Sequence, residues 1–174
     1  MTEPVTAYLS LGSNVGDRLA NLRRACAALA ERGVVIRRAS SVYETEPVDM
    51  REQTWFLNAV IEVETSFPPH RLLYEIEEIE RELGRERTVP KGPRTIDLDI
   101  LVHGNQIIRE EHLTVPHPEL HKRRFVLVPL CEIAPKLKLP LFDRTPEELV
   151  PELRDTSDVN KLAEPLLSAG QSVH

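Results

Sequence analysis

The first hundred residues alternate between two patterns of hydrophobic positions. Apolar residues at every second position predict strands with one buried face, and apolar residues every three or four positions predict amphipathic helices. Glycine or proline separates most of the segments. In chain order, the pattern predicts a strand at 5–11, a helix from 17 to 33, a strand at 34–45, a strand at 56–65, a helix from 68 to 84 and a strand at 95–102.

This order, strand-helix-strand-strand-helix-strand, is that of the split βαβ or ferredoxin-like fold. The sequence therefore predicts an α+β sandwich, a βαββαβ unit with a mostly antiparallel sheet and two helices on one face. The residues after the fourth strand are C-terminal additions, and among them 123–133 is compatible with either a helix or an extended run. We expect one domain over 1–154 and a loosely ordered tail over 155–174.

The chain has 174 residues and a net charge of -6, so it lacks the broad basic surface that nucleic acid or an acidic membrane would attract. No apolar run approaches the roughly 20 residues of a membrane span. The N-terminus has no basic segment followed by an apolar one, as a signal peptide would. We expect a cytoplasmic monomer with neither nucleic-acid nor membrane partners.

Two carboxylates mark the first candidate site. Asp97 and Asp99 are two residues apart on a predicted strand, so both side chains point to the same face, while Ile96, Leu98, Ile100 and Val102 point to the other. Close carboxylates repel one another unless a cation lies between them. Mg²⁺ commonly takes one or two carboxylates together with phosphate oxygens. On its own, however, the pair is also compatible with two acids on a solvated sheet face.

A basic segment directly precedes this pair. Within 81–94 there are five cations, and guanidinium groups match phosphate oxygens in bidentate geometry. Cations and a metal around one point are what phosphoryl transfer needs. We interpret Arg85 and Arg94 as phosphate ligands, and Arg81 and Lys91, taken singly, as members of a solvated charged loop.

A third cluster lies downstream, where Pro116 and Pro118 hold His117 in a stiff, extended segment from which it can donate to a phosphate. The spacing of the neighbouring histidines matches no standard zinc site. There is no P-loop motif. The glycine-rich turn 12–16 follows a strand and precedes a helix, and it is either an anion-binding turn or simply a tight turn.

Several short motifs occur along the chain in an order that resembles a known protein family. They are Leu11-Gly12-Ser13-Asn14, Phe56-Leu57-Asn58-Ala59, Gly84-Arg85-x-Arg87, Gly92-Pro93-Arg94-Thr95-Ile96-Asp97-Leu98-Asp99-Ile100-Leu101, and Leu113-Thr114-Val115-Pro116-His117-Pro118 followed by Arg123 and Phe125. Together they resemble the 6-hydroxymethyl-7,8-dihydropterin pyrophosphokinase family of folate biosynthesis, over about residues 8–135. That family has a ferredoxin-like fold, in agreement with the pattern above.

The resemblance implies transfer of pyrophosphate from ATP to 6-hydroxymethyl-7,8-dihydropterin, with AMP and the pterin diphosphate as products. It implies two Mg²⁺ ions on Asp97 and Asp99, with Arg85 and Arg94 as further catalytic residues. The implied ATP-binding residues are Leu73, Glu80, Arg85, Arg87, Arg94, Ile100, Thr114, His117 and Arg123. The implied pterin-binding residues are Thr45, Pro47, Val48, Phe56, Asn58, Asp97 and Phe125.

Two other functions stay open from the residues alone. A ferredoxin-like sheet is also the architecture of RNA-recognition modules, which stack bases on sheet aromatics. In this chain aromatics are only 5% of the residues and the predicted sheet face carries two aspartates, which disfavours RNA. The other alternative is a different Mg²⁺-dependent phosphotransferase or phosphohydrolase, which would differ in its products.

Overall fold

The computed structural model describes residues 3–46, 54–84 and 95–167 of the chain. Its elements are β1 (Val5–Ser13), α1 (Arg18–Glu31), β2 (Val35–Ala39), β3 (Tyr43–Thr45), β4 (Phe56–Thr65), α2 (Pro69–Glu82), β5 (Asp97–His103), β6 (Ile108–Arg109), β7 (Thr114–Val115), α3 (Arg124–Ile133), α4 (Pro146–Leu149), a 3₁₀ turn (Val150–Glu152) and β8 (Val159–Lys161).

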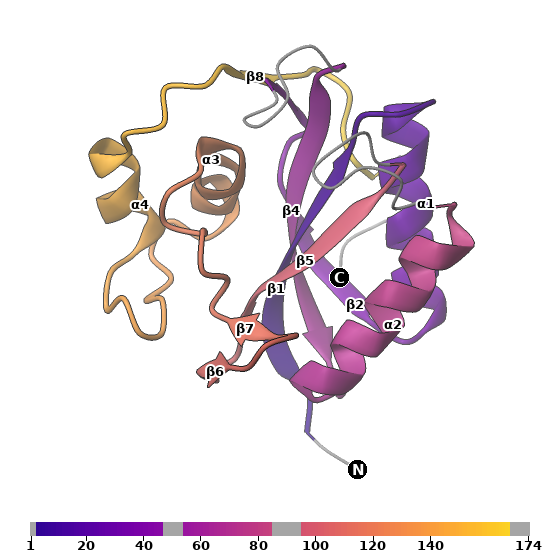
Figure 1. Cartoon of the computed structure of the whole chain (residues 1–174), viewed down its shortest axis with the longest axis horizontal. Helices are drawn as coiled ribbons and strands as arrows, with labels where there is room; N and C mark the ends of the chain where they lie inside the picture. Colours follow the sequence, from indigo (N-terminus) through magenta and orange to yellow (C-terminus); the bar gives the residue numbers. More distant parts are fainter. Residues whose placement is uncertain (1–2, 47–53, 85–94, 168–174) are drawn as a thin grey trace.

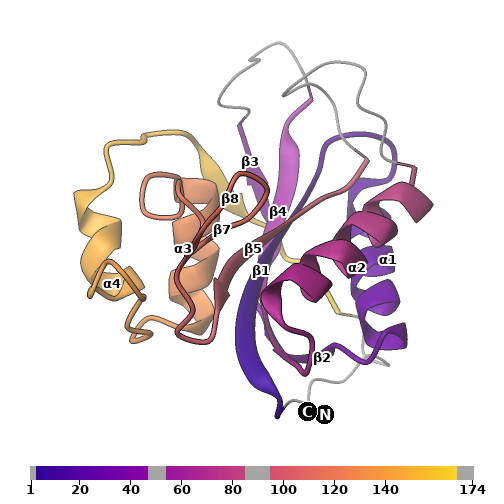
Figure 2. The same cartoon turned by 60° about the horizontal axis from the view of Figure 1, so that its bottom comes forward.

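One sheet forms the centre of the molecule, with strand order β5-β1-β4-β3-β8 and with β2 also paired to β4. The ladders between these strands are antiparallel. Helices α1 and α2 cover one face, and α3 with α4 lies on the other (Figure 1; Figure 2). The expected α+β, ferredoxin-like fold is confirmed, with a further helical layer built from the C-terminal additions.

Each sheet face has its own hydrophobic core. The core under α1 and α2 takes Leu9 from β1 and Ile61 from β4, both fully buried. The core under α3 takes Tyr8 and Val60, which alternate with those two residues along the same strands. Because successive side chains of a strand point to opposite faces, β1 and β4 connect both cores. The aspartates of the site described below lie on the α3 side of this shared sheet.

Strand β5 departs from the strict alternation that its sequence predicts. Ile96, Leu98 and Ile100 lie in the α1/α2 core as expected. The register with β1 shifts between Tyr8 and Leu9, which pair with Val102 and Ile100. A bulge of this kind turns the following side chain over. Val102 therefore packs in the α3 core, and the expectation that it faces away from the aspartates is wrong.

Two further expectations differ in detail, and the choice left open for 123–133 is decided. The strand predicted at 34–45 is divided into β2 and β3, because Ser40 accepts a hydrogen bond from Val60 N through its hydroxyl and donates one from its own N to Val60 O. The first strand continues through Gly12 to Ser13. The run 123–133 is a helix that contains Pro129.

The segment beyond residue 154 is more ordered than the loose tail that the sequence predicts. Val159–Lys161 adds β8 to the sheet beside β3. Leu166 is buried in the α1/α2 core, and the Arg23 guanidinium donates to the carbonyls of Pro165 and Leu166. Backbone pairing, which hydrophobic periodicity does not report, holds this segment in place. A domain boundary at 154 stays a prediction.

Candidate active site

Asp97 and Asp99 stand at the start of the edge strand β5 and are both partly exposed. Their partners on β1 are Gly12 and Ser10. Residues two apart on a strand share a face, with α-carbons roughly 7 Å apart. Leu98 between them is buried in the opposite core. The structure thus places the two carboxylates side by side above an apolar support, as the sequence predicts.

Glu80 of α2 holds this part of β5 in place. Its side chain is buried, and Oε2 accepts a hydrogen bond from the backbone N of Leu98 at 2.9 Å. That N–H lies between the two aspartates in sequence. A buried carboxylate is costly unless it is hydrogen-bonded, so the position of Glu80 is tied to that of the strand. Glu80, which the resemblance implies for ATP binding, contacts the backbone that carries the two aspartates.

A row of residues crosses the sheet from Asp97. In register, Asp97 pairs with Gly12 and Gly12 pairs with Asn58. Neighbouring α-carbons across an antiparallel ladder are about 5 Å apart, so Asp97 and Asn58 are about 10 Å apart. Asn58 is buried, and its Nδ2 donates to the hydroxyl of buried Thr45 at 2.5 Å. Phe56, two residues before Asn58, lies on the same face.

A cavity of about 240 Å³ opens on the other side of the aspartates. It lies at the edge of β5, between α2 and the segment 111–118. Its walls include Leu73, Asp99, Ile100, Thr114 and His117, so four of the predicted ATP-binding residues meet in one place next to a metal candidate. Asp99 therefore stands at the boundary between this cavity and the Asp97–Gly12–Asn58 row.

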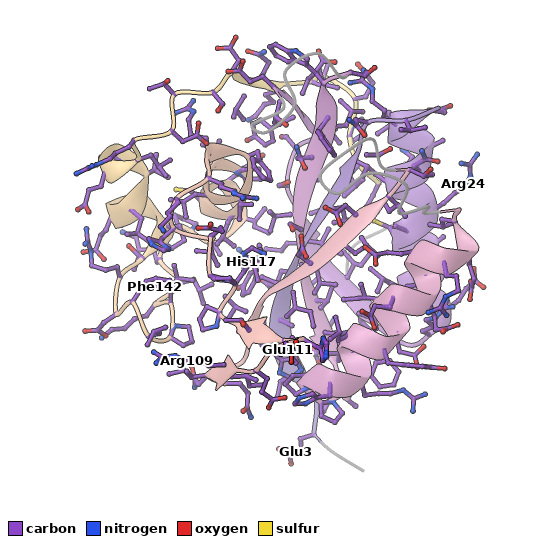
Figure 3. All side chains as sticks on the ribbon, viewed as in Figure 1. Glu3, Arg24, Arg109, Glu111, His117 and Phe142 are labelled. Atoms are coloured by element: carbon purple, nitrogen blue, oxygen red, sulfur yellow. The ribbon has the colours of Figure 1, made fainter. Side chains whose placement is uncertain are left out.

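His117 lines the cavity and has a defined hydrogen-bond donor. Its Nδ1 accepts from the backbone N of Glu119 at 3.1 Å, so the proton of the neutral ring is on Nε2. Burial and the positive charge of Arg123 lower the pKa of His117, while Glu119 and Asp97 act against this. The ring is accordingly neutral near pH 7, with Nε2–H as a donor. Figure 3 places His117 on the segment that runs from β7 towards α3, with Glu111 near β7.

The start of α3 brings Arg123 and Phe125 to this side of the sheet. The Arg123 guanidinium lies 5.7 Å from the centre of the Phe125 ring. The positive charge of Arg123 lowers the pKa of His117, so these two predicted ATP ligands are neighbours in space. The predicted residues Pro47, Val48, Arg85, Arg87 and Arg94 lie outside the described residues.

The sequence does not reveal some residues of the site. The cavity is also lined by Leu98, Glu111, His112, Leu113 and Pro118. All but Leu98 flank Thr114 and His117 directly, so their place in the chain is an available signal. The sequence pattern marks Gly12 only as the start of a turn. Its role needs the pairing of three strands, which one segment of sequence does not show.

The turn 12–16 is held as a tight turn by side chains of the turn and of the first residues of α1. Asn21 Nδ2 donates to the Val15 carbonyl at 2.9 Å and to the Ser13 hydroxyl at 3.2 Å. Asn14 Nδ2 donates to the Thr54 carbonyl at 3.1 Å. Asp17 caps α1 by accepting from Ala20 N at 3.1 Å. These contacts within the protein support the tight-turn interpretation over an anion site.

Paired carboxylates beside a cavity that also has a histidine donor meet the needs of phosphoryl transfer, which are positioning and neutralisation of charge, so the site fits the class of nucleotide-dependent phosphotransferases. Comparison with known proteins narrows this class. A protein-family model described as 7,8-dihydro-6-hydroxymethylpterin-pyrophosphokinase (HPPK) matches residues 8–135. The chain therefore belongs to the 7,8-dihydro-6-hydroxymethylpterin-pyrophosphokinase family.

Individual relatives agree with this. The chain is 48% identical over 133 residues to a 2-amino-4-hydroxy-6-hydroxymethyldihydropteridine pyrophosphokinase of Bacillus subtilis, covering 76% of this chain and 80% of that protein. It is 44% identical to the Haemophilus influenzae protein of the same name over 137 residues, covering 78% and 86%. A crystal structure of wild-type Plasmodium falciparum HPPK-DHPS matches with a TM-score of 0.67 and 16% identity, covering 87% of this chain and 45% of that one. The last likeness concerns the fold alone, and this chain spans less than half of that protein.

Proposed function

We propose that the site uses two Mg²⁺ ions, held by Asp97 and Asp99, and that ATP and the pterin bind on opposite sides of these aspartates. The reaction itself follows from family membership: the chain is an ATP-dependent diphosphokinase that transfers pyrophosphate from ATP to 6-hydroxymethyl-7,8-dihydropterin, a step of folate biosynthesis. The products are AMP and the pterin diphosphate.

The donor set is compatible with a hard cation. Two carboxylates on one sheet face supply what Mg²⁺ usually takes from protein, and phosphate oxygens and water complete its coordination. Among the residues that the structure describes, no group of three or more His, Cys, Asp or Glu side chains could hold a metal. When bound, Mg²⁺ would neutralise the triphosphate charge that develops during transfer.

The cavity supports ATP binding on the β5 edge. Leu73 and Ile100 offer apolar walls for a base, and His117 offers Nε2–H to a phosphate oxygen. A neutral imidazole donates this hydrogen bond without a pH-dependent charge near neutral pH. Asp99 lines the same cavity, so a triphosphate that leaves the apolar part passes directly to the carboxylates. We propose Glu80 as a support of this site through Leu98, and Arg123 as a further phosphate ligand.

The polar row supports pterin binding on the sheet face. A pterin ring presents amide-like donors and acceptors along one edge, and a buried amide such as Asn58 can pair with both kinds. Thr45 fixes the direction of that amide. Phe56 and Phe125 come from β4 and α3 on the same side of the sheet, where aromatic rings can stack on a flat ring. The hydroxymethyl oxygen would then point towards Asp97.

The observation that carries this proposal is the position of the two aspartates between the cavity and the row. Its test is Asp97→Asn, which keeps shape and removes the charge, with Asp143→Asn as control. Asp143 is an exposed aspartate at φ 55, a conformation that asparagine tolerates. We expect AMP and pterin diphosphate formation, followed by chromatography, to fall on the order of 100-fold or more for Asp97→Asn, and to need more Mg²⁺. Unchanged turnover would refute the metal assignment.

We also propose that the chain acts as a cytoplasmic monomer, as its composition predicts. No helix in the described parts of the chain is long and apolar enough to cross a membrane. Sedimentation velocity at micromolar protein concentration tests the monomer, and a concentration-dependent rise in mass would contradict it.

A further inference from the structure

The segment Asp155–Lys161 contacts the candidate active site from outside, and it lies beyond residue 135, where the family match ends. Its strand β8 pairs with β3, with Val159 opposite Thr45. Immediately beyond, Glu46 N donates to the Asp158 carbonyl at 3.2 Å and Asp158 N donates to Glu46 Oε1 at 3.0 Å. The segment thereby fixes the end of β3, which carries Thr45.

The same segment fixes the start of α3. Asp155 Oδ2 accepts from the backbone N of Arg124 at 3.0 Å, and the Ser157 carbonyl accepts from Arg124 Nε at 3.0 Å. Arg123, at the N-cap position, makes no side-chain cap hydrogen bond. A helix start has N–H groups that need acceptors and a partial positive charge that favours an anion. Asp155 therefore caps α3 from 31 residues away in sequence.

Ser157 holds the Asp155 carboxylate in position for this contact. Its Oδ1 accepts from Ser157 N at 2.8 Å and also from the Ser157 hydroxyl. Burial acts against ionisation of Asp155, but the bonds from Ser157 and Arg124 outweigh it and lower its pKa. One oxygen is thus used to shape the segment and the other to hold the helix.

These contacts connect two walls of the site. On one side stand Thr45 and, through its hydrogen bond, Asn58. On the other stand Arg123 and Phe125, the residues that flank Arg124. We propose that Asp155–Lys161, which we call the C-terminal clasp, is a positioning element that sets the separation of these walls and so the affinity for the pterin. This proposal depends on the proposed location of the pterin.

The test compares Asp155→Ala with Asp158→Ala. Both remove one negative charge from the clasp, but Asp158 makes its two bonds to Glu46 through the backbone and keeps them. Asp155→Asn is the conservative variant, since its amide retains one acceptor oxygen. Each enzyme is assayed for KM and kcat with both substrates, and for unfolding by urea.

We expect Asp155→Ala to raise the KM for the hydroxymethyl dihydropterin at least about fivefold, as the loss of one positioning hydrogen bond allows, with kcat at saturation within about twofold. Asp155→Asn should lie between Asp155→Ala and wild type, and Asp158→Ala should match wild type. An unchanged KM in Asp155→Ala, or an equal rise in Asp158→Ala, would overturn the clasp.

If Asp155→Ala does not fold, Asp155→Asn decides alone: a raised pterin KM supports the clasp and an unchanged one refutes it. The proposed function is judged separately. Wild-type formation of AMP and pterin diphosphate tests the reaction, and Asn58→Ala tests the pterin location. If Asn58→Ala has the same KM for the pterin as wild type, the proposed pterin location is wrong, whatever the clasp variants show.

Discussion

The Asn58 side chain lies across the backbone of Gly12. A Cβ placed on Gly12 would come within 2.6 Å of Asn58 Oδ1, closer than such atoms approach in proteins. Gly12 pairs with Asn58 on one side and with Asp97 on the other, so it fills the middle of the row that connects the amide to the carboxylates. The missing side chain of Gly12 leaves the space in which the Asn58 amide is held.

Gly12→Ala should therefore weaken pterin binding through Asn58. The added methyl forces the amide away from its position and breaks its bond to Thr45, because the sheet backbone moves less readily than a side chain. We expect a roughly tenfold higher pterin KM, equivalent to about 1.4 kcal/mol, and an unchanged Kd for ATP. The double variant Gly12→Ala/Asn58→Ala is the control. If the two effects add fully, Gly12 acts by a route other than Asn58.

His117 gives a prediction for pH. Its pKa in the native protein is below the ordinary value of 6.5, mainly because of burial and then Arg123. As pH falls through about 6.5, the unfolded chain takes up a proton that native His117 resists until lower pH. This difference makes the free energy of unfolding decrease with falling pH in that window, and the contribution is fully present above it.

The measurement is urea unfolding of wild type and His117→Gln between pH 5 and pH 8. We expect the wild type to lose more stability than the variant as pH falls, because the variant lacks this proton uptake. The other five histidines are common to both proteins and cancel in the difference. A wild-type curve that runs parallel to the variant curve would show that His117 titrates normally.

Glu80 provides a prediction that links stability to activity. Glu80→Ala leaves the buried N–H of Leu98 without this acceptor, which costs about 1–3 kcal/mol of unfolding free energy. Because Leu98 lies between Asp97 and Asp99, we also expect kcat to fall. Glu80→Gln keeps an acceptor oxygen and should be milder in both respects. An alanine variant with wild-type kcat would show that the bond does not position the carboxylates.

The parts of this structure that the sequence predicts are those in which local pattern and tertiary packing agree. The pattern predicts strand β4 with the bounds that it has, 56–65, because its alternation matches two opposite cores. The division of β2 from β3 depends on Ser40 bonding to Val60, a contact 20 residues away. The Val102 side chain faces the α3 core because of a bulge against β1. Neither is visible in the hydrophobic pattern of one segment.

In the candidate site, too, residues placed by local pattern could be predicted and residues placed by distant contacts could not. Asp97, Asp99 and Asn58 could be placed because their faces follow from strand alternation, and His117 because prolines flank it. Gly12 and Asp155 could not, since the former acts through register across three strands and the latter through a bond to Arg124. Charge and turn signals describe such residues only locally, whereas their contacts are made by distant parts of the chain.

Two adjacent leucines of α2 separate nucleotide binding from stability. Leu73 lines the cavity, whereas Leu72 is fully buried in the core under α1 and α2. Leu72→Ala should lower the free energy of unfolding by about 2–5 kcal/mol and leave the ATP affinity of the folded protein unchanged. Leu73→Ala should instead weaken ATP binding, with a Kd about 5- to 30-fold higher from about 1–2 kcal/mol of lost apolar contact, and should cost little stability. Calorimetric titration with ATP and Mg²⁺, beside urea unfolding, measures both, and a Leu73→Ala protein that binds ATP like wild type would place the base outside this cavity.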